Sequence, residues 1–564
     1  MLSSVRALLM SCVLLMDLRS GAATNQAKED LFESTNLLRI AIDIPSEGVR
    51  QLEMAQRQFN SQQKKTKVRA TVREGRMLYT NVTVQLKGTG TFRSISQQPS
   101  LTLNFASLAP AQRFHGLGKI SLNNSVQDPT CLNEKLSREL FTRAGVPVPR
   151  ADHALVTLNG RDLGLYVLLE GVDKRFLKRH FKQTGGNVYD GGFLQDIDQP
   201  LQLNSGRKIN DYSGLRRLVL AAREPDPNRR FAALEKALDV ERFVSMIAME
   251  AILCHWDSYS MNRSNYRVYH DPTTDKLVFI PHGMDRVLGG FKQNLDLALI
   301  PPMQGIAARA LISTPEGRRR YLERIGTLFT NVFQPEVVCR WVREIDRKIA
   351  GALPDPGRRW PVQIRDPLWD VQTSGNHPRD VDALCRRITI RAEDLSHQFT
   401  LPAESWAPAP VVKFNSAGVA AITNWTPRAM YLRPPAIHQT TVRDGRQIWR
   451  ITTPDFGAIG CRVSLTSGKY RLAGRIKSPA GKSVPNVILR YSGNRFGAMR
   501  MSEYVLRANS PAADWQEMAF DFQVAEGAAP EEIELLCEVL GQPRTGQTSG
   551  EIWFDLSACR LLKR

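Results

Sequence analysis

The sequence predicts an α+β protein, with a two-lobed mixed domain followed by an all-β sandwich. Strand-like alternation dominates residues 37–170, helical periodicity dominates residues 211–390, and short strands with little helix return after residue 412. We therefore expect a β-rich lobe and a helical lobe within residues 37–400, a Pro-rich linker over residues 401–411 and a jelly-roll sandwich over residues 412–564.

The first lobe alternates strands with two helices. One helical stretch is Gly48–Asn60, and the other is Asn133–Ala144, whose apolar residues have helical spacing before Gly145 ends it. The dipeptide Asn159-Gly160 predicts a hairpin more strongly than any other short segment. The expected strands are Leu37–Ile44, Val68–Val72, Val82–Leu86, Leu101–Phe105, Lys119–Leu122, Ala154–Leu158 and Leu165–Glu170.

The second lobe is largely helical, with one strand hairpin at Asn265–Tyr269 and Leu277–Pro281 closed by the turn Pro272–Asp275. Its expected helices are Phe231–Ala237, Val240–Leu253, Pro315–Phe333 and Val337–Ala352. Beyond the connector Trp406–Pro410, alternating segments separated by turn residues predict the sandwich strands. Those strands are Gln447–Thr452, Gly460–Leu465, Tyr470–Ile476, Asn486–Tyr491, Glu517–Val524, Glu532–Val539 and Glu551–Leu556.

The N-terminus has the anatomy of a secretory signal peptide. Met1–Arg6 is a short positive start, Ala7–Met16 is an apolar core, and Ser20–Thr24 supplies small residues for cleavage. No apolar run in the sequence reaches the roughly 18 residues that a membrane span needs. We expect residues 1–23 to direct export to the periplasm, the cell surface or the medium, with at most a peripheral membrane association.

The chain carries 76 Lys and Arg against 56 Asp and Glu, a formal net charge of +20. Arg is spread along the sequence and no zinc-finger, RNP or basic-zipper pattern is present, which argues against nucleic acid as the partner. The surplus favours attraction to an acidic protein, a nucleotide or an anionic surface.

Seven of the eight cysteines follow the expected cleavage site. They form no CxxC pair and lie near no cluster of His, which argues against a zinc site. Cys461 can form one disulfide with Cys537 or with Cys559 in the last segment. The alternative is that these cysteines are buried thiols.

The densest group of functional side chains lies at Cys254–Asp271 (CHWDSYSMNRSNYRVYHD), on a loop between an expected helix and an expected strand. Asp257 and Asn262 lie five residues apart there, and Asp285 follows the apolar end of the next strand. Asn262 and Asp285 supply hard oxygen ligands for Mg²⁺ or Mn²⁺ carrying phosphates, and Asp257 can accept the proton of an attacking hydroxyl. Protein kinases use this order of groups. The alternative is that Asp257 and Asn262 only cap and brace a turn.

The segment HWDSYSMNRSNYRVYHD, followed by FIPHGMD, resembles the core of the CotH family, the spore-coat kinases with an atypical protein-kinase fold. Val84–Thr91 (VQLKGTGT) resembles the glycine-containing strand of that family, Asp128–Arg143 its helix after a loop Asp, and Thr157–Asp173 its hairpin ending in Glu. The resemblance spans residues 37–395. It implies a Ser/Thr protein kinase that uses ATP with Mg²⁺ or Mn²⁺ and acts on an extracytoplasmic or surface protein.

The resemblance also implies a role for each matching residue. Asp257 is the catalytic base, Asn262 and Asp285 are metal ligands, and Asn265 is an alternative amide ligand. The candidates for nucleotide binding are the cations Lys87 and Lys135, with Glu170 as a partner for either; the alternative for Lys87 is a solvated strand residue.

Two departures from the family pattern bear on activity. Many relatives read Trp-Asp-x-Asp where this chain has His282-Gly283-Met284-Asp285, so one of two carboxylates is absent, and the glycine motif lacks its usual Asn. We expect an active kinase because the second Asp is retained. The alternative is an inactive kinase-like scaffold or a glycan-binding surface protein.

The C-terminal part resembles the jelly-roll carbohydrate-binding modules of secreted bacterial proteins, in Leu465–Gly474 (LTSGKYRLAG), Asp514-Trp515 and Gly550–Leu556 (GEIWFDL). The resemblance implies that a cell-surface glycan stacks on exposed aromatic rings. A third and weaker hypothesis is a glycoside hydrolase, which needs two facing carboxylates. The sequence nominates only Asp257 and Asp285 for such a pair. The aromatic candidates, which otherwise belong to the core, are Trp425, Tyr431, Tyr491 and Phe496.

Overall fold

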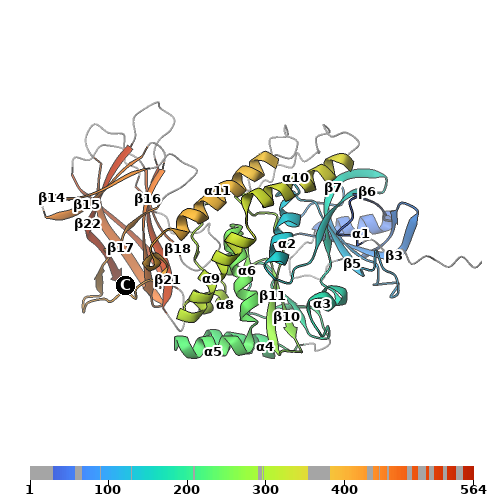
Figure 1. The fold of residues 1–564 in the computed structure, drawn as a ribbon, viewed down its shortest axis with the longest axis horizontal. Coiled ribbons are helices and arrows are strands. Elements are labelled where there is room, and N and C mark those ends of the chain that lie inside the picture. Colours follow the sequence, from blue (N-terminus) through green and yellow to red (C-terminus); the bar gives the residue numbers. More distant parts are fainter. Residues whose placement is uncertain are drawn as a thin grey trace, which may run out of the picture.

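We describe the protein from a computed structural model. The structure describes residues 30–564 except 58–65, 89–90, 129, 207–209, 290–294, 296, 353–380, 429–435, 444, 454–455, 479–485, 493–503, 507–513, 525–529 and 541–549. The expected signal peptide, residues 1–23, lies outside this part. The described chain contains both helices and sheets, so the predicted α+β class is confirmed (Figure 1).

The N-terminal strands form a closed barrel in the order β1-β2-β3-β4-β5-β7-β6, at the right of Figure 1. β1 and β6 pair in parallel, with Leu38 opposite Ala154, and this pairing closes the barrel. Inward-facing residues alternate with exposed ones along the strands, as in β2, because successive side chains point to opposite faces. The strands are β1 (Leu38–Asp43), β2 (Val68–Glu74), β3 (Met77–Lys87), β4 (Ser100–Asn104), β5 (Lys119–Asn123), β6 (Ala151–Leu158) and β7 (Arg161–Glu170), with helices α1 (Ser46–Arg57) and α2 (Asn133–Arg143).

The middle of the chain is a helical region around a small sheet in the order β11-β10-β8-β9. Helix α6 (Val240–Ile252) is buried along nearly all of its length, because it is apolar on almost every side. The other sheet and helix bounds are α3 (Lys174–His180), β8 (Val188–Asp190), β9 (Gln202–Ser205), α4 (Ser213–Ala222), α5 (Pro227–Ala237), α7 (Tyr259–Asn262), β10 (Tyr266–Asp271), β11 (Lys276–Pro281), α8 (Ile306–Ile312), α9 (Pro315–Asn331), α10 (Pro335–Ala352) and α11 (Val381–Phe399).

The C-terminal part contains two sheets, at the left of Figure 1. One has the order β14-β15-β22-β17-β20 with β12 paired to β22, and the other has the order β13-β16-β21-β18-β19. Their inner faces share one apolar core. The bounds are η1 (Ala403–Trp406), β12 (Val419–Ala421), β13 (Thr426–Arg428), β14 (Ile437–Arg443), β15 (Arg446–Thr453), β16 (Phe456–Leu465), β17 (Gly468–Lys477), β18 (Asn486–Ser492), β19 (Tyr504–Leu506), β20 (Gln516–Val524), β21 (Glu531–Leu540) and β22 (Gly550–Lys563).

The described cysteines are all buried, and no disulfide joins any of them. The bridge from Cys461 to Cys537 or Cys559 is therefore absent from the structure, and the three side chains lie in the sandwich core. Every helix in the described ranges is too short or too polar to cross a bilayer.

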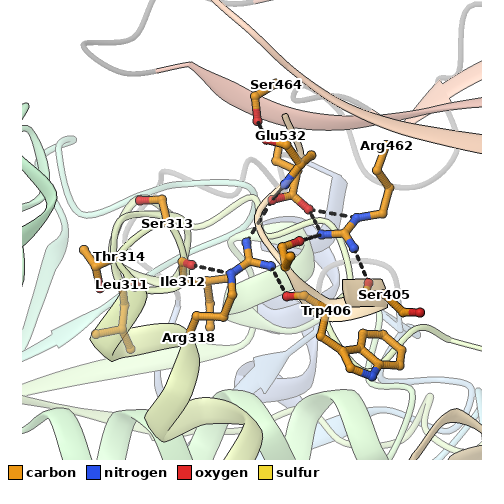
Figure 2. A network of polar contacts seen from close by, with 12 residues as sticks. Leu311, Ile312, Ser313, Thr314, Arg318, Ser405, Trp406, Arg462, Ser464 and Glu532 are labelled. Atoms are coloured by element: carbon orange, nitrogen blue, oxygen red, sulfur yellow. Dashed lines mark hydrogen bonds and ion pairs between the residues drawn. The ribbon is translucent and has the colours of Figure 1, made fainter. Parts of the chain in front are cut away.

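A polar network joins the helical region to the sandwich (Figure 2). Arg318 on α9 donates to Glu532 on β21 at 2.8 Å and to the carbonyl of Trp406 at 3.0 Å. Arg462 on β16 also donates to Glu532 and to the carbonyl of Ser405, at 2.9 and 2.6 Å. One carboxylate thus holds two arginines from the two parts, and both arginines hold the segment that connects them.

We expect Glu532→Gln to lower the free energy of unfolding by about 2–4 kcal/mol, because the side chain of Arg318 is 6% exposed and would lose its counter-charge. Urea unfolding measures the loss, and proteolysis within residues 401–411 should become faster. The control is Glu517→Gln, whose carboxylate pairs with Arg475 on the surface and should change stability by less than about 1 kcal/mol. Equal losses in both variants would show that the network does not stabilise the junction.

Candidate active site

The loop after α6 turns back on itself through three left-handed residues. Cys254, Arg263 and Asn265 have φ angles of 50°, 52° and 54°. The short helix α7 lies between the first two of them, and the amide of His282 donates to the carbonyl of Asn265 at 2.9 Å. This bond ties the end of β11 to the loop and brings the turn after β11 beside it.

The two amides of this loop hold the carboxylate of Asp257. Asn262 donates from Nδ2 to Oδ1 of Asp257 at 2.7 Å, and Asn265 donates from Nδ2 to Oδ2 at 2.9 Å and to the main-chain carbonyl at 2.8 Å. Burial raises the pKa of Asp257 above its usual value, whereas both amides and the charge of Arg286 oppose that rise. The hydrogen bonds from Asn262 and Asn265 therefore brace the loop, and they also fix the Asp257 carboxylate in one orientation.

The two amides differ in their remaining oxygen. Oδ1 of Asn262 is buried and has no hydrogen-bond partner among the described residues. Oδ1 of Asn265 lies against Gly283, 2.3 Å from the point where a Cβ on that glycine would stand. Since Gly283 also has φ +65°, a side chain at this position would be strained and would displace Asn265.

Asp285 lies in the turn after β11, and Nδ2 of Asn133 at the start of α2 donates to its carbonyl at 2.9 Å. Burial, together with the negative charges of Glu134 and Asp257, raises the pKa of Asp285 to about 7, against the charge of Arg286. Across the ranges that the structure describes, no three His, Cys, Asp or Glu side chains are placed to hold a metal ion. A cation here would therefore depend on carboxylate, amide, water and phosphate oxygens, which suits Mg²⁺.

Glu134 is a functional candidate that the sequence did not reveal. Its side chain is 2% exposed and accepts from Nε of Arg138 at 2.8 Å. The other oxygen, Oε1, is buried without a partner in the described structure. An acidic residue in the first turn of a helix usually only complements the helix dipole. The sequence around Glu134 fits that ordinary role, so it did not indicate a functional one.

The family described as CotH kinase protein matches residues 84–373, just over half of the chain. The chain belongs to the CotH family. The inner spore coat protein H of Bacillus subtilis (strain 168) is 23% identical over 310 residues, covering 51% of this chain and 80% of that protein. Invasin CotH2 of Rhizopus delemar is 24% identical over 345 residues, covering 54% of this chain and 58% of that protein.

Solved structures similar to part of this CotH protein include carbohydrate-binding modules. TmCBM61, solved with β-1,4-galactotriose, is 14% identical, covers 26% of this chain and 91% of its own, and has a TM-score of 0.19. The CBM22-1 xylan-binding domain from Paenibacillus barcinonensis Xyn10C is 13% identical over 28% of this chain and 97% of its own, also with a TM-score of 0.19. Scores this low carry no argument, so the sandwich assignment depends on its two sheets.

The three predicted nucleotide-binding residues of this CotH protein differ in their surroundings. Nζ of Lys87, at the end of β3, donates to Oδ1 of Asn123 at 2.5 Å, and its charge contributes to lowering the pKa of His282, which burial mainly lowers. The charge of Lys87 therefore acts on His282, the first residue after β11 in the turn that carries Asp285. Nζ of Lys135 donates to the carbonyl of Ala151 at 3.1 Å and lies 3.6 Å from Oδ1 of Asp152, on the barrel side of α2.

The predicted partner of Glu170 was wrong. Its buried carboxylate accepts from Arg179, at 2.7 Å to Oε1, and from the backbone amide of Arg150 at 3.0 Å, rather than from Lys87 or Lys135. These partners hold the pKa of Glu170 below its usual value although burial, the largest influence, raises it. Glu170 therefore anchors the end of β7.

The aromatic candidates of the sandwich are only partly described. Trp425 is 5% exposed and donates from Nε1 to the carbonyl of Ile422 at 3.1 Å, so it belongs to the core. Tyr431, Phe496 and the side chain of Tyr491 lie outside the described residues.

Proposed function

We propose that this CotH protein is an exported ATP-dependent protein kinase that phosphorylates Ser or Thr of an extracytoplasmic or surface protein. In this proposal the barrel and the helical region are the two lobes of an atypical kinase fold. The observation that carries it is the pair of amide hydrogen bonds that fix the Asp257 carboxylate beside the turn holding Asp285.

Asp257 accepts the proton of the attacking hydroxyl, and its two amide donors set the direction from which that proton arrives. Asp285 and the unpartnered Oδ1 of Asn262 supply the metal ligands, which favours Asn262 over Asn265 for this role. Mg²⁺ or Mn²⁺, when bound, neutralises charge on the phosphate oxygens. Lys87 contacts the phosphates from the barrel side.

The glycine at position 283 fits this arrangement. A carboxylate there would push Asn265 away from Asp257, because a Cβ alone would meet the Asn265 side chain. The loss of one carboxylate therefore goes together with a tighter hold on the base, which favours activity over a scaffold role.

The relatives support a surface or extracellular location, since they are named as a spore coat protein and an invasin. Export through residues 1–23 and an acidic or surface-associated protein substrate, favoured by the +20 charge, belong to the same proposal. Glycan binding by the sandwich stays a prediction.

Asp257→Asn should lower phosphotransfer by about 10²–10⁴-fold, because the amide cannot take a proton and places an N–H against one of the two amide donors that hold Asp257. The assay incubates the full chain with radiolabelled ATP, Mg²⁺ and casein as a generic Ser/Thr substrate. Asp521→Asn, on the sandwich surface, is the control and should retain full activity. Equal rates in wild type and Asp257→Asn would reject the kinase assignment, and an absence of Mg-ATP binding by calorimetry would favour the scaffold alternative.

A further inference from the structure

Two buried cysteines face each other between α10 and α11. Sγ of Cys339 lies 3.7 Å from the carbonyl oxygen of Cys385, and Sγ of Cys385 lies 3.9 Å from the carbonyl oxygen of Cys339. The two residues are 7% and 6% exposed. Burial, together with the neighbouring Cys385, raises the pKa of Cys339 to about 12. Each thiol therefore lies against the backbone of the other cysteine, and both side chains are shielded from solvent.

We propose that Cys339 and Cys385 form an intrachain disulfide when the protein folds in an oxidising environment. The thiolate of one cysteine attacks a disulfide oxidant such as glutathione disulfide and releases one glutathione thiol. The second thiolate then displaces the other glutathione, so two electrons pass to the oxidant and both thiol protons leave. Because both side chains are buried once the helices have packed, the exchange occurs while α10 and α11 are still assembling.

The bond would join two helices that hold different parts of the molecule. On α10, Lys348 donates to the barrel residue Asp152 at 2.7 Å and to the carbonyl of Ser34 at 2.5 Å. On α11, Arg387 donates to the carbonyl of Leu288 at 2.9 Å, shortly after Asp285. The two helices lie side by side (Figure 1), so a disulfide between them would fix the candidate site relative to the barrel.

The test uses the full chain refolded in a buffer of oxidised and reduced glutathione, followed by alkylation of remaining thiols and peptide mapping without reduction. We expect one cross-linked peptide pair containing Cys339 and Cys385, and neither residue alkylated. Cys559→Ser, which alters a sandwich cysteine, should leave that pair intact. Alkylation of both Cys339 and Cys385 in the folded wild type, or their linkage to other cysteines, would overturn the proposal.

A second measurement is made on the wild-type chain, with a double variant as its control. Reducing the oxidised wild type should lower its thermal midpoint by about 4–10 °C, because the bond closes a long loop of the unfolded chain. The double variant Cys339→Ser/Cys385→Ser should be insensitive to the reductant. This proposal depends on the proposed function only for the oxidising environment that export provides. Neither measurement requires ATP, so failure of the kinase assignment would leave this result unaffected.

Discussion

Asp285→Asn is expected to remove Mg²⁺-dependent ATP binding while making the nucleotide-free protein more stable above pH 7. The pKa of Asp285 rises from 3.8 to about 7 on folding, so the folded state holds a proton that the unfolded state has lost between these values. Stability therefore falls as the pH rises from about 4 to 7, and the full cost remains above pH 7. Asn carries no charge and avoids the free-energy cost of a charged Asp285 in the folded state. That cost is about 2–4 kcal/mol, because partial exposure of the side chain reduces the penalty of the pKa shift.

Urea unfolding at pH 5 and pH 8 measures the change in stability, and calorimetry with Mg-ATP measures the loss of nucleotide binding. Phosphotransfer should fall by about 10³-fold or more, since the metal loses its carboxylate ligand. In wild type, Mg-ATP affinity should weaken as the pH drops below 7, because the metal must displace a proton. The control Asp521→Asn should change neither Mg-ATP binding nor the pH dependence of stability. A variant that binds Mg-ATP normally, or that gains no stability at pH 8, would contradict this account of Asp285.

The sequence revealed the parts of the candidate site that lie close together in the chain. Asp257 and Asn262 share one loop, and Asp285 follows the hairpin β10–β11, so local spacing was enough to nominate these three, whereas Asn265 came from the family resemblance. The family resemblance implied the same roles for these three residues that their chemistry had suggested. The hydrogen bonds of Asp257 could not be foreseen, because they depend on the left-handed turns at Arg263 and Asn265.

The parts that the sequence missed are brought in by distant segments. Asn133 reaches the carbonyl of Asp285 across 152 residues of chain, and Glu134 acts on the same carboxyl. The parallel pairing of β1 with β6 closes the barrel. The alternation of residues along one strand does not predict which other strand will pair with it. Glu170 was paired wrongly for the same reason, since Arg179 lies on a helix whose position only the tertiary structure defines.

Arg391 on α11 is fully buried and hydrogen-bonds to several backbone carbonyls near the candidate site. Its side chain donates to the carbonyls of Ala251 and Ile252, at 2.9 and 3.0 Å, at the end of α6. It also donates to the carbonyls of Leu295 and Leu297, at 3.0 and 2.7 Å. Arg391 therefore satisfies the last turn of the helix from which the Asp257 loop starts.

Arg391→Met should lower the free energy of unfolding by about 3–5 kcal/mol, because it leaves these carbonyls unsatisfied and Asp394 buried without its arginine. Urea unfolding measures the loss. Arg386→Met, an exposed position on the same helix, is the matched control and should change stability by less than about 1 kcal/mol.

The double variant Arg391→Met/Asp394→Leu separates the two causes. If the unpaired Asp394 carboxylate dominates, the double variant recovers stability relative to Arg391→Met, since burial already raises the pKa of Asp394 and its removal leaves no charge. If the orphaned carbonyls dominate, the double variant is no more stable, and the Asp257 loop loses its support in both. A loss below about 1 kcal/mol in Arg391→Met would show that water or a shifted α11 replaces these bonds, and that Arg391 does not hold the site.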